Sequence, residues 1–284
     1  MSVAVITCVY NEAYNLPRWR AWYGAAFGEA NLFVVDQSST DGSTFDLGVC
    51  NRICVPRRPL DEVARADFMS RLHGMLLHHY DVVILTDCDE LLVPDPAKYS
   101  GLADFVERMS GDHVTAVGLN LIQILTEEAP LDSQRPLLGQ RSVVGFTPWM
   151  CKTLISRVPT RWLPGFHACD LPTAFDPDLF LFHTKLADFD AALRRHRINQ
   201  QTQWSDQAIE QGHGGHHRVD QRRFVEDYFL MPIQWINQGH VQDFDFTRDI
   251  AAYHEVLASH QDFLQSDRWG MWFARVPERF HDKF

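Results

Sequence analysis

Short apolar runs alternate with longer amphipathic segments over the first 85 residues. The apolar runs have strand length and lie at residues 3–9, 32–35, 53–55 and 82–85. Residues 16–27 and 60–80 carry apolar side chains at helical spacing between them. Strands that are apolar throughout and alternate with helices are typical of a parallel sheet covered on both faces. The pattern therefore predicts an α/β fold with a mostly parallel central sheet flanked by helices.

The longer of the two helical segments shows which of its faces we expect to pack on the sheet. Its apolar positions on one face are Leu60, Val63, Ala64, Phe68, Leu72, Met75 and Leu76. Residues spaced by three and four positions share one side of a helix. We expect this side to be buried.

The alternation becomes less regular after residue 101. Extended segments are predicted at 114–125, with a bend near Asn120, and at 152–158 and 179–182. Residues 186–197 have a helical pattern, 200–219 that of a loop, and 222–284 that of helices. We expect a main domain over residues 1–197, with residues 198–284 forming a lid loop and a helical extension packed on the same domain.

Polar residues gather at the end of three predicted strands. They lie in segments 10–15, 36–43 and 87–90. The carboxyl ends of parallel strands meet at one edge of a sheet, and ligands of open α/β sheets bind there. We therefore expect the three segments to form one site.

The net charge of −11 limits the classes of partner. A nucleic-acid binder needs a basic face, and adsorption to an anionic membrane needs one as well. No apolar run is long enough to cross a bilayer, and the first residues lack the features of a signal peptide. The six cysteines are scattered, which favours reduced thiols. We expect a cytoplasmic protein with no nucleic-acid partner and no transmembrane segment.

Two carboxylates follow the strand at residues 82–85. Asp87 and Asp89 are separated by one residue, so an extended backbone places them on one side. Adjacent carboxylates repel each other, and Mg²⁺ or Mn²⁺ between them relieves the repulsion. Aspartates are also common in turns at strand ends, which is the structural alternative.

Three segments together carry a resemblance to a known family. They are Cys8-Val9-Tyr10-Asn11-Glu12, Val34-Val35-Asp36-Gln37-Ser38-Ser39-Thr40-Asp41-Gly42 and Leu85-Thr86-Asp87-Cys88-Asp89-Glu90. In this order they resemble glycosyltransferase family 2 and its D-x-D-E relatives, which have the Rossmann-like GT-A fold. The resemblance is good over residues 3–96 and weaker to about residue 197.

The resemblance implies a role for individual residues. The donor nucleotide sugar would contact Thr7, Tyr10, Asn11, Glu12, Asp36 and Asp87. Arg71 lies sixteen positions before Asp87, where relatives often place an arginine that meets the donor. Asp89 would be the direct metal ligand. Many relatives have a second aspartate where this chain has Gln37, which leaves the base specificity open.

The histidines supply candidates for the rest of the site. His183 follows an apolar run and is the expected third metal ligand with Asp87 and Asp89, and Lys185 beside it would offset phosphate charge. Alternatively, His183 is an exposed residue at a strand end.

No carboxylate is an obvious catalytic base, which inverting sugar transfer requires. Asp170 is the first candidate and His167 the second, with Asp206 as a further alternative. The segment Gly212–His217 is either a lid over the diphosphate or a solvated loop.

These residues predict a metal-dependent glycosyltransferase that moves a sugar from a nucleotide diphosphate, expected to be UDP, to a hydroxyl of a glycan or another acceptor. By resemblance, the transfer is expected to invert the anomeric centre. A nucleotidyltransferase would usually carry a Gly-rich basic loop after the first strand, and residues 10–15 contain neither glycine nor a basic residue. A non-catalytic module that binds a nucleotide sugar or a glycan remains the other alternative.

Overall fold

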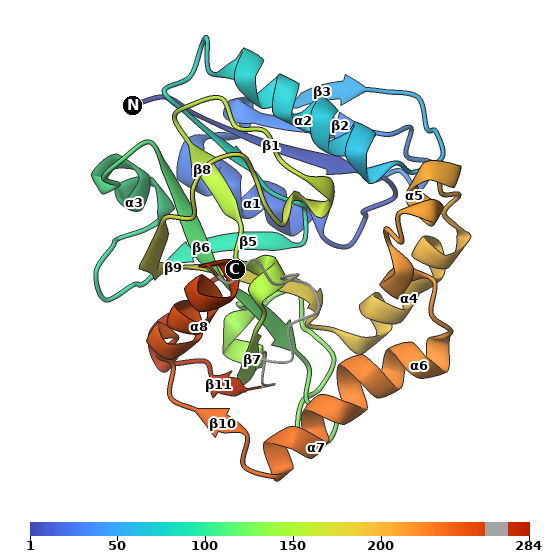
Figure 1. Ribbon diagram of the computed structural model, residues 1–284, viewed down its shortest axis with the longest axis vertical. Coiled ribbons are helices and arrows are strands. Elements are labelled where there is room, and N and C mark those ends of the chain that lie inside the picture. The colour runs from blue at the N-terminus through green and yellow to red at the C-terminus, as the bar shows by residue number, and fades with distance from the viewer. Residues whose placement is uncertain (259–271) are drawn as a thin grey trace.

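A single mixed sheet runs through the protein, with helices on both faces (Figure 1). The computed structural model describes residues 1–258 and 272–284. Within these residues the sheet has 11 strands in the order β10-β11-β7-β6-β8-β4-β1-β2-β3, and β9 pairs with β5 and β6. The predicted α/β class is confirmed.

The N-terminal half of the sheet is parallel. Its strands are β3 (Asn51–Cys54), β2 (Leu32–Asp36), β1 (Val3–Val9) and β4 (Val82–Leu85). The connecting helices are α1 (Leu16–Phe27), η1 (Glu29–Asn31) and α2 (Glu62–Leu76). Alternate residues of β1 face opposite sides, since Val5 packs in the cluster with α1 and Ile6 in the cluster with α2. The two helices therefore cover opposite faces, as predicted.

The buried face of α2 differs from the predicted one. The helix buries Ala66, Met69, His73 and Leu76, whereas Phe68 and Met75 are 42% and 66% exposed. Only Leu76 belongs to both sets. The predicted face was wrong because α2 presents its smaller and more polar side to the sheet, a choice that tertiary packing makes and periodicity does not show.

The second half of the sheet is mainly antiparallel. It contains β5 (Glu90–Pro94), β6 (His113–Ile122), β7 (Val143–Phe146), β8 (Thr153–Ser156) and β9 (Phe175–Leu186), with the helices α3 (Leu102–Arg108), η2 (Leu138–Gln140), η3 (Pro148–Met150) and η4 (Pro164–Phe166). β6 continues through Asn120 as one strand. β5 and β7 were not predicted from the sequence.

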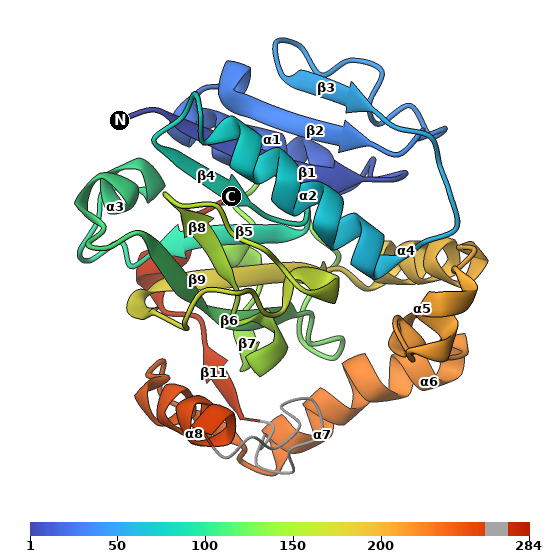
Figure 2. The ribbon, with the colours of Figure 1, turned by 45° about the horizontal axis from the view of Figure 1, so that its top comes forward.

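The chain then forms an arc of helices around one side of the sheet (Figure 2). Its elements are α4 (Phe189–Gln201), α5 (Asp206–Glu210), η5 (Gly215–His217), α6 (Gln221–Val225), the π-helical η6 (Glu226–Leu230), α7 (Met231–Asn237), β10 (Val241–Gln242), α8 (Thr247–Ala258), β11 (Phe273–Arg275) and η8 (Glu278–Phe280). The segment 200–219 is not one loop, because it contains α5 and η5. The helical prediction for 222–284 is wrong at β10 and β11, which extend the sheet, and its part at 259–271 lies outside the described residues.

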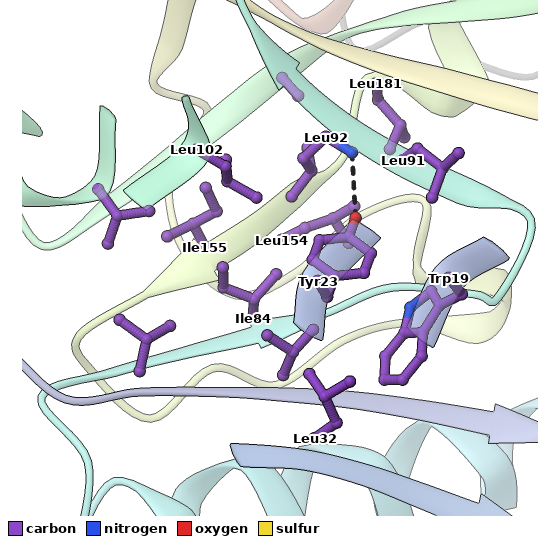
Figure 3. Packing of buried hydrophobic residues seen from close by; sticks show 14 of the residues in the cluster. Trp19, Tyr23, Leu32, Ile84, Leu91, Leu92, Leu102, Leu154, Ile155 and Leu181 are labelled. Atoms are coloured by element: carbon purple, nitrogen blue, oxygen red, sulfur yellow. Dashed lines mark hydrogen bonds between the residues drawn. The ribbon is translucent and has the colours of Figure 1, made fainter. Parts of the chain in front are cut away.

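Aromatic side chains of α1 fix the segment that carries the acidic motif (Figure 3). The Tyr23 hydroxyl donates to the Glu90 carbonyl oxygen at 3.0 Å and accepts from the Leu92 amide at 3.0 Å. The Trp19 indole donates to the Thr86 hydroxyl at 2.8 Å. Both rings are completely buried. Their hydrogen bonds fasten residues 86–92 to α1.

None of the helices in the described part of the chain is long and apolar enough to span a membrane.

Candidate functional site

The loops after β1, β2 and β4 lie at the same edge of the sheet. β1 pairs in parallel with β2, where Val9 lies opposite Asp36, and with β4 on its other side. The carboxyl ends of the three strands are therefore neighbours. The three polar segments meet at this edge, as predicted.

Asn11 joins the β1 loop to the β2 loop. It has a φ of +53°, a conformation that asparagine tolerates better than most residues. Its backbone N–H donates to the Ser39 hydroxyl at 3.0 Å. Its side-chain Oδ1 accepts from the backbone N–H groups of Thr40 at 2.8 Å and Asp41 at 3.3 Å. These contacts assign Asn11 to shaping the loops. Thr7, also predicted at the donor site, is fully buried in β1, and its hydroxyl has no hydrogen-bond partner among the described residues.

The Asp36 carboxylate is fully buried and engaged by the protein itself. Its Oδ1 accepts from the Ser39 amide at 2.8 Å, and its Oδ2 accepts from the Thr44 hydroxyl at 2.8 Å and from Arg52 Nη2 at 2.6 Å. Burial acts to raise the pKa of Asp36, but the hydrogen bonds from Ser39 and Arg52 outweigh it and hold the pKa below its usual value. Asp36 therefore stays charged and orders the loop after β2, where the nucleoside of the donor is expected to bind.

An arginine of α2 reaches the acidic motif, but it is Arg65. Its Nη1 lies 3.1 Å from Asp87 Oδ1 and its Nη2 lies 2.9 Å from Glu62 Oε2. Arg71, predicted to meet the donor, is three-quarters exposed and pairs with Asp67 at 2.8 Å. The position that the motif resemblance assigns to a donor-binding arginine is therefore wrong for Arg71, and Arg65 is the arginine beside the acidic motif.

A buried lysine lies behind the acidic motif. Lys152 Nζ is 2.5 Å from Glu90 Oε1 and 3.6 Å from Asp87 Oδ2. Glu90 also accepts from the Asp87 amide at 3.1 Å, which fixes the turn. Burial opposes a charge on Lys152, but the attraction of Glu90 and Asp87 outweighs it and raises the pKa of Lys152. The negative charge of Asp87 is thus compensated by Arg65 and Lys152. Sequence reasoning missed both cations, because nothing local marks a lysine as the partner of an acid 62 residues away.

Asp89 faces His183 across the pairing of β5 with β9. Glu90 and His183 are register partners, and the Thr184 amide donates to the Asp89 carbonyl at 2.8 Å. His183 Nε2 consequently lies 3.3 Å from Asp89 Oδ2. Burial acts to raise the pKa of Asp89, but His183 and, more weakly, Lys185 and Arg195 lower it well below its usual value.

Asp89 and His183 together fit a divalent cation, and Asp87 does not join them. A carboxylate oxygen and an imidazole nitrogen at 3.3 Å form a mixed donor set of the kind that Mn²⁺ accepts. No group of three or more His, Cys, Asp or Glu side chains in residues 1–258 and 272–284 is placed to hold a metal ion. The described residues thus bring together two side chains of the type that ligate such ions, Asp89 and His183, whose usual further ligands are phosphate oxygens and water.

The two candidates for the catalytic base lie in different environments. His167 Nδ1 donates to the Trp149 carbonyl at 2.6 Å, and Gly165 lies so close that a Cβ there would meet the His167 ring at 2.6 Å. Burial and then the Lys152 charge lower the pKa of His167 to about 3, so the ring is neutral and its Nε2 is an acceptor. Asp170 is exposed and accepts from the Arg161 amide at 2.8 Å. Of the two, His167 is the residue whose pKa is affected by the charges of Lys152 and Asp87.

Arg195 of α4 fastens the β1 loop. Its Nη2 lies 2.8 Å from Glu12 Oε1, and its Nη1 donates to the carbonyl oxygens of Tyr10 at 2.9 Å and Asn11 at 3.1 Å. Burial raises the pKa of Glu12 to about 7 in spite of Arg195. Lys185 is partly buried, and its Nζ has no hydrogen bond or ion pair within the described part of the chain. Burial lowers the pKa of Lys185, whereas the nearby Asp89 acts to raise it, so the charge of an anionic ligand would favour the ammonium form.

A flat platform lies at the outer end of the β1 loop. The Arg57 guanidinium stacks on the Tyr10 ring, 3.9 Å from its centroid, and Arg57 Nη1 donates to Gln37 Oε1 at 2.5 Å. Arginine on an aromatic face is a cation–π pair with a planar surface. Gln37, which stands where many members of the family that the motifs resemble have aspartate, is thereby fixed by Arg57.

The segment Gly212–His217 is packed against the protein. Gly214 has a φ of +64°, and a Cβ there would lie 1.9 Å from Trp204 Cη2, so only glycine fits. His217 Nδ1 accepts from Asn199 Nδ2 at 3.1 Å, and the rings of His216 and His217 are 3.9 Å apart. The His217 side chain is half-buried, whereas that of His216 is exposed. The segment thus packs on Trp204 through Gly214 and His217, while Gly212, Gly215 and His216 are exposed.

Comparison with known proteins adds no family assignment. No protein-family model matches the chain, and no curated protein matches it. Among solved structures, CMP:2-keto-3-deoxy-manno-octonic acid synthetase complexed with CTP is similar at 14% identity, with a TM-score of 0.26. The match covers 56% of this chain and spans 65% of the length of that one. So low a score carries no functional argument, and the glycosyltransferase resemblance depends on the motifs alone.

Proposed function

We propose that this protein is a metal-dependent glycosyltransferase that uses a nucleotide-diphosphate sugar. The observation that carries the proposal is the placement of Asp89, His183 and the unpaired Lys185 together at the carboxyl edge of β1 and β4. Two ligands for a divalent cation beside a free ammonium group suit a diphosphate, since both compensate its negative charge. From the motif resemblance, we further propose a UDP sugar as donor and inversion at the anomeric carbon.

The surrounding residues have defined parts in this function. A divalent cation held by Asp89 and His183 would supply positive charge to the leaving diphosphate. Lys185 binds a phosphate oxygen directly, and Arg195 keeps the β1 loop in place against it. His167 presents a neutral Nε2 that accepts the hydrogen bond of an acceptor hydroxyl and orients it. Arg65 pairs with Asp87 and Lys152 pairs with Glu90, and these ion pairs fix the turn next to the site.

A panel of nucleotide sugars tests the proposal. Release of nucleoside diphosphate is measured for each donor with Mn²⁺, with Mg²⁺ and after chelation by EDTA. We expect one donor to be turned over only with a divalent ion. Asp89→Asn should lower that rate by about 100-fold or more, because a ligand charge is lost.

Asp112→Asn is the matched control for this experiment. Asp112 is exposed on the chain before β6, and its replacement should leave the rate unchanged. The proposal is abandoned if no donor reacts with either ion, or if Asp89→Asn binds UDP in the presence of Mn²⁺ as tightly as the wild type does.

A further inference from the structure

One continuous row of paired residues crosses four strands beside the proposed metal site. Glu90 on β5 lies opposite His183 on β9, and His183 lies opposite Asn120 on β6. Asn120 in turn lies opposite Gly145 on β7. Neighbours in such a row project from the same face of the sheet. The row therefore places Asn120 directly behind the imidazole that faces Asp89.

The hydrogen bonds around Asn120 fix the orientation of its amide. The Thr147 hydroxyl donates its one proton to the Gly145 carbonyl at 3.2 Å. Its oxygen is then an acceptor for Asn120 Nδ2, which lies 2.8 Å away. The amide nitrogen is thus directed to Thr147, so Asn120 Oδ1 must be the atom that lies 2.7 Å from His183 Nδ1.

This orientation decides which imidazole nitrogen is protonated. An amide oxygen has lone pairs and no proton to give, so the hydrogen bond requires a proton on His183 Nδ1. In the neutral ring the lone pair is then on Nε2, the atom 3.3 Å from Asp89 Oδ2. Two electron-rich atoms facing each other form a ready place for a cation.

We propose that Asn120, held by Thr147, is a positioning residue that keeps His183 in the Nδ1-protonated tautomer, so that Nε2 and Asp89 bind a divalent cation. The inference rests on the proposed function and adds two residues to it that the sequence motifs do not include. Metal-binding histidines generally donate their second ring N–H to an acceptor, and removal of such acceptors typically costs 10–100-fold in metal affinity. Asparagine suits the place because it accepts the proton without adding a charge that would favour the imidazolium form.

The tautomer of His183 is measured by ¹H–¹⁵N NMR on metal-free protein with labelled histidine, with His183→Ala used to assign the signal. Mn²⁺ affinity is measured by EPR titration. We expect the wild type to show a protonated Nδ1. Asn120→Ala and Thr147→Val should each give a mixture of tautomers and bind Mn²⁺ about 10–100-fold more weakly. Thr147→Ser keeps the hydroxyl and should behave as the wild type.

Thr115→Val is the matched control for lost hydroxyl groups. Thr115 lies on β6, and its hydroxyl bonds that of Thr153 at 2.6 Å, so its loss lowers stability without involving Asn120. It should leave the tautomer and the Mn²⁺ affinity unchanged.

Three outcomes overturn the inference: a neutral His183 ring in the wild type that carries its proton on Nε2, equal Mn²⁺ affinity in the wild type, Asn120→Ala and Thr147→Val, or no Mn²⁺ binding at all. Failure of the proposed function is a separate result. It is recognised when the wild type binds Mn²⁺ and shows the expected tautomer but turns over no nucleotide sugar.

Discussion

At the scale of single residues, the site is defined by the placement of charge. Lys152 and Glu90 are both buried, and Lys152 Nζ lies 2.5 Å from Glu90 Oε1. The other carboxylate, Asp87, pairs with both Lys152 and Arg65. A buried ion pair adds little to stability over apolar residues of the same shape, but removing one partner leaves an uncompensated charge. The arrangement therefore serves to hold the acidic turn beneath the site rather than to stabilise the fold.

Lys152→Met tests this view. Leaving Glu90 without its buried partner should lower the free energy of unfolding by about 3–5 kcal/mol, measured by urea denaturation. The double variant Lys152→Met/Glu90→Gln removes both charges and should regain a good part of that loss. Lys98→Met breaks the pair of the exposed Lys98 with Asp178 and should lower stability much less than Lys152→Met does. A double variant no more stable than Lys152→Met would contradict the account.

At the scale of elements, α4 contributes to the site through a single side chain. Arg195 bonds two carbonyl oxygens and one carboxylate of the β1 loop, which is 184 residues away in sequence. These bonds compensate for a loop in which Asn11 has a positive φ. The position of residues 10–12 thus depends on α4.

Arg195→Gln should free this loop. We expect amide hydrogen exchange of residues 10–12 to rise at least about 10-fold, since bonds to two carbonyls and an ion pair are lost. The donor KM should rise with it if the loop binds the donor. Arg194→Gln on the same helix is exposed and serves as the control, with exchange unchanged. Equal exchange in the two variants would show that α4 does not hold the loop.

The elements also show how far sequence reasoning reached. The parallel strands and the convergence of segments 10–15, 36–43 and 87–90 were predictable, because apolar runs and strand order are local signals. β5 was missed because Pro94 resembles a break, although proline at a strand end costs no ladder bond. Arg65, Lys152, Arg195 and Asn120 were missed because each acts through a partner on another strand or helix, and one sequence carries no record of such pairs.

At the scale of the whole molecule, the site lies where the two halves of the sheet meet. The parallel half supplies the loops after β1, β2 and β4, and the antiparallel half supplies His183, Lys185 and Lys152 on β9 and next to β8. A chain with a net charge of −11 thus gathers several of its cations at one edge. This concentration suits a polyanionic ligand, whereas the overall charge repels extended ones such as nucleic acids.

A buried histidine of α2 also makes the fold sensitive to acid. His73 is fully buried on α2, with its ring 4.8 Å from that of Trp162, and burial lowers its pKa to about 4 from 6.5. The unfolded chain therefore binds more protons than the folded one between these values, so stability present above pH 6.5 is lost as the pH falls towards 4. The loss amounts to about 3 kcal/mol.

We expect His73→Phe to remove that part of the acid sensitivity. Phenylalanine keeps the aromatic contact and cannot be protonated. As the pH falls from 6.5 to 4, the free energy of unfolding of the variant should therefore rise relative to that of the wild type by up to about 3 kcal/mol. Urea denaturation at half-unit pH steps measures the difference. His79→Phe, at an exposed position just beyond α2, should keep the wild-type pH dependence. If His73→Phe and the wild type lose stability in parallel, the acid sensitivity arises elsewhere and His73 is protonated equally well in both states.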